Sequence, residues 1–96
     1  LSRDAEEARR RAERQRALER LANDAEAAWT GIDRTLQRGS GAAYDQALQS
    51  LRALAEALAQ AGREREFRRG LDRLQQDHGR RGAWVKRLIA AGWVEK

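Results

Sequence analysis

The residues best suited to chemistry in this chain are arginines, and they gather in its last third. Arg80, Arg81, Lys86 and Arg87 bracket Trp84. A guanidinium group binds phosphate or carboxylate through two parallel hydrogen bonds, and a neighbouring indole can stack on a nucleic-acid base. Four more arginines lie shortly before this segment at helical spacing: Arg65, Arg68, Arg69 and Arg73. These eight residues are the candidate binding set for nucleic acid or for a protein partner.

The charge distribution also points to the last third of the chain as the region that binds a partner. The chain carries a net charge of +5. Residues 1–62 hold ten basic and ten acidic side chains, whereas residues 63–96 hold ten basic and five acidic ones. The surplus therefore lies entirely in the last third, where it can attract phosphate or an acidic protein surface. The alternative interpretation is that these arginines only solvate the outward face of a helix.

Catalytic and metal chemistry find little support in the sequence. The chain has no Cys, which excludes a thiolate zinc site, a disulfide framework and a cysteine nucleophile. Its single histidine, His78, lies in a predicted turn among arginines, where we expect it to cap a helix C-terminus. None of the few hydroxyl residues has an activating neighbour, and phosphate-loop, dinucleotide and metalloprotease motifs are absent. We therefore expect a protein that is not an enzyme and binds no cofactor or metal.

The elements that must position these residues are predicted to be helices. Pro is absent, and Ala and Leu dominate the apolar residues with 19 and 11 copies. Apolar residues at steps of three and four predict a first helix that ends near Arg38, followed by helices over about 42–61, 63–77 and 83–91. We expect an all-α fold, a small antiparallel helical bundle of three long helices plus a short C-terminal helix, with a charged N-terminal helical extension.

Within these helices, a few residues have predicted packing roles. The strongest apolar stripe belongs to the second helix: Tyr44, Ala47, Leu48, Leu51, Leu54, Ala55 and Leu58. Trp29 is predicted to anchor the core, and Trp93 to fold back on it. Gly31 predicts a bend or a close helix approach, and Gly70 predicts a close contact or a weak point in the third helix.

Residues 1–17 form a separate unit in this interpretation, and residues 18–96 form the bundle domain. The first unit is charged, with only small alanines between its charged side chains, so it predicts a solvated projecting helix or a linker. Arg11 and Arg14 occupy positions where a coiled coil needs apolar residues. No apolar run reaches about 18 residues, so we expect no membrane span. Because the chain opens at Leu1 without Met, we expect a fragment of a longer protein.

Several of these residues together resemble a known family. Trp29 and Ile32, then Tyr44-Asp45-x-Ala47 with Leu51 and Leu54, then Phe67, Leu71 and Leu74, His78-x-Arg80-Arg81, Leu88 and Ala91-Gly92 resemble the C-terminal region of bacterial SWIM zinc-finger proteins. The resemblance covers about residues 27–93. It implies a helical fold, a fragment and a cytoplasmic bacterial setting. The C-x-C…C-x-H zinc motif of that family is absent, because the chain has no Cys.

The expected function is a non-catalytic helical interaction or accessory module that docks to a protein partner or to an adjoining domain. The alternative is a nucleic-acid-binding module that uses the arginine face of the third helix and the 78–87 turn. The resemblance implies nucleic-acid association for the parent protein more than for this segment. The sequence leaves the oligomeric state open.

Overall fold

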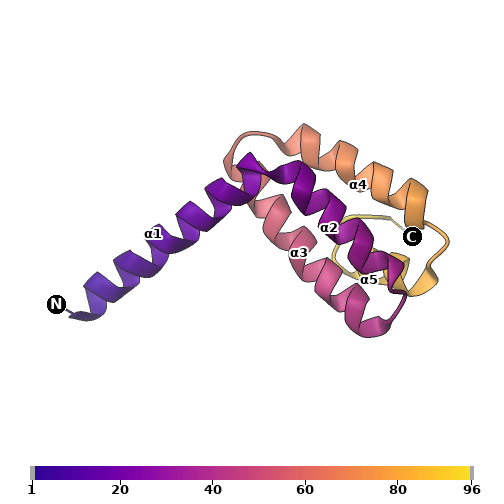
Figure 1. The fold of residues 1–96 in the computed structure, drawn as a ribbon, viewed down its shortest axis with the longest axis horizontal. Coiled ribbons are helices and arrows are strands. Elements are labelled where there is room, and N and C mark those ends of the chain that lie inside the picture. Colours follow the sequence, from indigo (N-terminus) through magenta and orange to yellow (C-terminus); the bar gives the residue numbers. More distant parts are fainter. Residues whose placement is uncertain (1, 96) are drawn as a thin grey trace.

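The computed structural model describes residues 2–95 and confirms the all-α prediction. Its described residues form five helices and no strand: α1 (Ser2–Asn23), α2 (Ala25–Gln37), α3 (Gly41–Gln60), α4 (Glu64–His78) and α5 (Gly82–Ala90). Helices α2, α3 and α4 follow one another back and forth, while the first part of α1 projects away from them (Figure 1). None of the described helices is long and apolar enough to cross a membrane.

The prediction of one continuous helix up to Arg38 is wrong, because the chain breaks at Asp24. This residue has φ −122° and ψ 44°, outside helical geometry, and it separates α1 from α2. The break frees carbonyl groups at the end of α1, and Arg63 Nη1 donates a hydrogen bond of 2.8 Å to one of them, the Ala22 carbonyl. Gly31, predicted to mark a bend or a close approach, lies inside α2, and a Cβ at this position would have nothing within 4 Å.

Helix α3 is the element on which the other four helices pack. Ala47, Leu51, Leu54 and Leu58 are fully buried along one of its faces, as their spacing predicted. Ser40 caps its N-terminus by accepting a hydrogen bond of 3.1 Å from the Ala43 amide. At the other end Gly62 adopts φ +72°, a conformation that suits glycine and allows the chain to leave the helix.

Helix α5 packs on α3, and the C-terminal tail packs against the same core. Trp84 is fully buried, and its ring centroid lies 6.3 Å from that of Tyr44. The Trp84 Nε1–H has no acceptor among the described residues, a cost that burial of the large indole offsets. Trp93 folds back as predicted, with its ring centroid 6.0 Å from that of Phe67.

Candidate functional site

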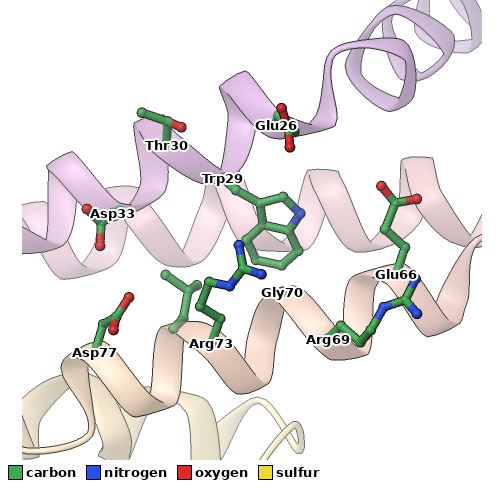
Figure 2. Close-up of a pocket in the computed structure, with 10 residues that line it drawn as sticks. Glu26, Trp29, Thr30, Asp33, Glu66, Arg69, Gly70, Arg73 and Asp77 are labelled. Carbon is green, nitrogen blue, oxygen red and sulfur yellow. The ribbon is translucent and has the colours of Figure 1, made fainter.

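An open groove lies between α2 and α4 in the described part of the chain. It has a volume of about 490 Å³. Helix α2 contributes Glu26, Trp29, Thr30 and Asp33 to its lining, and α4 contributes Glu66, Arg69, Gly70, Arg73, Leu74 and Asp77. The Trp29 ring lies between the two helices with charged side chains around it (Figure 2). The groove therefore combines an apolar floor with a rim of both charge signs.

The contact between Trp29 and Gly70 forms the floor. The six-membered ring of Trp29 rests directly on the Gly70 backbone, so closely that a Cβ at position 70 would overlap the ring. Trp29 also packs near Phe67, whose ring centroid is 5.6 Å from its own. Trp29 is half-buried, which leaves part of the indole available at the groove. The close contact predicted at Gly70 is confirmed, and Trp29 anchors the α2–α4 contact from the edge of the core.

Two of the four carboxylates of the groove are held by basic partners. Arg63 binds Glu66 through both Nε and Nη2, at 2.5 and 2.8 Å. The hydrogen bonds from Arg63 lower the pKa of Glu66 below its ordinary value, and the nearby charge of Arg69 acts in the same direction. The same pairing raises the pKa of Arg63. Glu66 is therefore a fixed negative charge at one end of the groove.

His78 holds the second carboxylate, Asp33, at the other end of the groove. The ring is 5% exposed, and its Nε2 lies 2.7 Å from Asp33 Oδ1. Arg81 Nε donates a hydrogen bond of 3.0 Å to the other ring nitrogen, Nδ1. Because a guanidinium can only donate, Nδ1 must be the acceptor, and the proton lies on Nε2, which donates to Asp33. His78 thus links α4 to α2, and its ring does not cap a helix as predicted.

Three of the eight predicted binding residues are engaged within the protein. Arg68 donates to the Trp93 carbonyl at 3.3 Å and lies 3.8 Å from Asp72. Arg87 binds Asp45 at 2.8 Å and places its guanidinium carbon 5.6 Å from the Tyr44 ring centroid. Arg81 makes the hydrogen bond to His78. These side chains join helices or order a turn, so they are less available to a partner than the sequence suggested.

The other five predicted residues are exposed, and the structure brings only two of them into the groove. Arg69 and Arg73 line it from α4, one helical turn apart (Figure 2). Arg65 lies one further turn toward the N-terminus of α4, outside the lining. Arg80 is in the turn after α4, and Lys86 is on the exposed side of α5. The predicted basic set is therefore dispersed over one helix face, one turn and a second helix.

Sequence reasoning missed the acidic half of this site. Glu26 and Asp33 lie on α2 and Asp77 lies on α4, and nothing in their spacing along the chain shows that they share a groove. The available signal was indirect. A glycine inside α4 and a tryptophan inside α2 are complementary in shape, and this contact sets the two helices beside each other.

The side chains that line the groove suit the binding of a charged ligand. Among residues 2–95, no group of three or more His, Cys, Asp or Glu side chains could hold a metal ion. The one imidazole uses both ring nitrogens in structural hydrogen bonds. Trp29 presents an indole face that attracts cations, and the carboxylates beside it attract the same charge. An arginine- or lysine-bearing ligand with a small apolar face fits this combination.

Comparison with protein-family models, curated proteins and solved structures finds no match to this chain. The resemblance to the C-terminal region of SWIM zinc-finger proteins therefore stays a prediction.

Proposed function

We propose that this chain is a non-catalytic interaction module, an antiparallel helical bundle that docks a protein partner in the α2–α4 groove. The partner segment is basic and has a small apolar face. The setting that we propose is a bacterial cytoplasmic protein of the kind that the SWIM resemblance implies.

The observation that carries this proposal is the composition of the groove. The half-buried Trp29 indole lies between carboxylates on two helices, Glu26 and Asp33 on α2 and Glu66 and Asp77 on α4. Glu26 and Asp77 are exposed, and neither has a hydrogen-bond partner among the described residues. These two carboxylates are the charges most available to a ligand. A basic ligand would form a more favourable ion pair with either of them than with a carboxylate that already has a basic partner.

The nucleic-acid alternative has weaker support. Arg69 and Arg73 lie among four carboxylates, which repel phosphate. Arg65, Arg80 and Lys86 are exposed but lie on separate parts of the surface. The exposed arginines are the only feature that favours nucleic-acid binding. Oligonucleotides are therefore included among the probes of the experiment below.

The proposal is tested by titrating the purified chain with defined fluorescent probes at low and physiological salt. The probes are an alanine- and arginine-rich helical peptide, its alanine- and glutamate-rich counterpart, and single- and double-stranded oligonucleotides. We expect only the basic peptide to bind, and we expect the double variant Glu26→Lys/Asp77→Lys to bind it about tenfold more weakly.

A matched control keeps the total charge change equal. Glu64→Lys/Glu95→Lys alters two exposed carboxylates outside the groove and should bind the basic peptide nearly as wild type does. Equal loss in both double variants would mean that only net charge matters, and would overturn the groove as the site. Strong salt-dependent binding of the oligonucleotides, lost on substitution of Arg65 and Arg80, would favour the alternative function instead.

A further inference from the structure

The α1 extension, defined here as residues 2–17, has an unusual position in the structure. It continues the helix beyond Leu18, the first buried residue of the chain, and projects from the rest of the molecule (Figure 1). Its side chains are exposed, with Ala12 half-buried. Among the described residues, one ion pair joins it to another helix, between Arg14 and Glu56 of α3. Helix formation there gains almost nothing from burial within a single molecule.

The surface of the α1 extension is patterned nonetheless. Ala5, Ala8 and Ala12 recur at steps of three and four, so they share one face of the helix. By the same helical geometry, Arg9 and Arg16 border this face on one side, whereas Gln15, Asp4 and Arg11 lie on the other. A narrow stripe of small residues with arginines along one edge can place those arginines beside the carboxylates that flank an indole.

Charge and length both match between the α1 extension and the groove. The extension carries six arginines and four carboxylates, a net charge of +2. The groove lining carries four carboxylates and two arginines, a net charge of −2. Along α4 the lining runs from Glu66 to Asp77, twelve residues whose ends lie about 16 Å apart along the helix axis. The patterned part of the extension, Ala5 to Arg16, also has twelve residues.

We infer that the groove binds the α1 extension of a second copy of this chain. This rests on the proposed function and names its partner. The alanine face of the extension lies over Trp29, and Arg9 and Arg16 reach the carboxylates of the rim, among them Glu26 and Asp77. Within one molecule the extension points away from the bundle as a continuous helix, so it meets only the groove of another molecule (Figure 1). Two copies that exchange extensions form a closed dimer, and one-way insertion forms a chain of molecules.

The test is a charge exchange measured by sedimentation velocity over a concentration series. Wild type should self-associate, and this association should weaken as salt is raised. The extension variant Arg9→Glu/Arg16→Glu and the groove variant Glu26→Lys/Asp77→Lys should each weaken self-association about tenfold. An equimolar mixture of the two variants should restore association, because the glutamates of one then meet the lysines of the other. Circular dichroism of each variant should show that its helix content is unchanged.

The possible outcomes separate this inference from the proposed function. A wild-type chain that stays monomeric at every accessible concentration, yet binds the basic peptide probe in its groove, overturns the second-copy inference and leaves the proposed function standing. Failure of both self-association and peptide binding overturns both. Self-association that neither charge variant weakens, or that the mixture does not restore, places the contact elsewhere and also overturns the inference.

Discussion

Substituting Gly70 by alanine tests the contact that builds the groove floor. Two effects oppose each other at this position. Alanine is favoured over glycine inside a helix by about 1 kcal/mol. The new methyl group would overlap the six-membered ring of Trp29, and such overpacking typically costs about 1–3 kcal/mol. The net stability change of Gly70→Ala is a weak test by itself. If the overpacking cost is about 1 kcal/mol, it nearly cancels the gain in helix propensity.

A matched control isolates the overlap. Gly31 also lies inside a helix, and a Cβ there would have nothing within 4 Å, so Gly31→Ala receives the helix-propensity gain alone. We expect Gly31→Ala to stabilise the protein by about 1 kcal/mol. Gly70→Ala should be about 1–3 kcal/mol less stable than Gly31→Ala. For a domain of this size, each kcal/mol corresponds to about 4–8 °C in Tm.

Urea and thermal unfolding followed by far-UV circular dichroism measure this difference. The same substitution made in a Trp29→Ala variant shows whether overlap with the Trp29 ring causes the difference. When Trp29→Ala has removed the ring, Gly70→Ala should become stabilising, as Gly31→Ala is. Identical stability of Gly70→Ala and Gly31→Ala in the wild-type background would refute the argument, because it would mean that Trp29 moves aside without cost and does not define the floor.

Three further predictions concern the core, a helix cap and one ion pair. Leu54→Ala, at a fully buried position of α3, should cost about 2–5 kcal/mol in urea unfolding, and an unchanged midpoint would mean that a different face of α3 is buried. Ser40→Ala removes the acceptor of the Ala43 amide and should cost about 0.5–2 kcal/mol, whereas Ser40→Asp should retain most of the stability. Because Arg63 lowers the pKa of Glu66 below its usual 4.5, this pair stabilises the fold above that pH, and the contribution disappears as pH falls through the lowered pKa. Thermal melts from neutral to acidic pH should therefore fall less steeply for Glu66→Gln than for wild type, and parallel curves would contradict the pairing.

Local patterns predicted most of the helices because burial at steps of three and four is visible along the chain. The buried stripe of α3 follows from this spacing. The break at Asp24 does not follow from this spacing, and Arg63, which binds the Ala22 carbonyl next to the break, lies thirty-nine residues after Asp24. A hydrogen bond between residues so far apart in the sequence cannot be predicted from the spacing of apolar residues.

The candidate site was predictable only in part, for a related reason. Arginines drew attention to α4, and two of them, Arg69 and Arg73, do line the groove. The carboxylates that give the groove its character come from two helices, and their assembly depends on how a glycine of one helix receives the tryptophan of the other. The number of charges along a sequence does not show which of them are neighbours in the folded protein. The excess of arginine in the last third therefore gave no indication that carboxylates line the groove.

The end of α1 and the wall of the groove share one side chain. Arg63 holds the Ala22 carbonyl at the base of the extension and the Glu66 carboxylate at the rim. Leu18 and Ala22 hold the end of α1 in the core, and the sixteen residues before Leu18 extend about 24 Å, so a bend of about 10° at Leu18 would move the tip by about 4 Å. Because Arg63 makes both contacts, the end of α1 and the rim of the groove are held in place by the same guanidinium group.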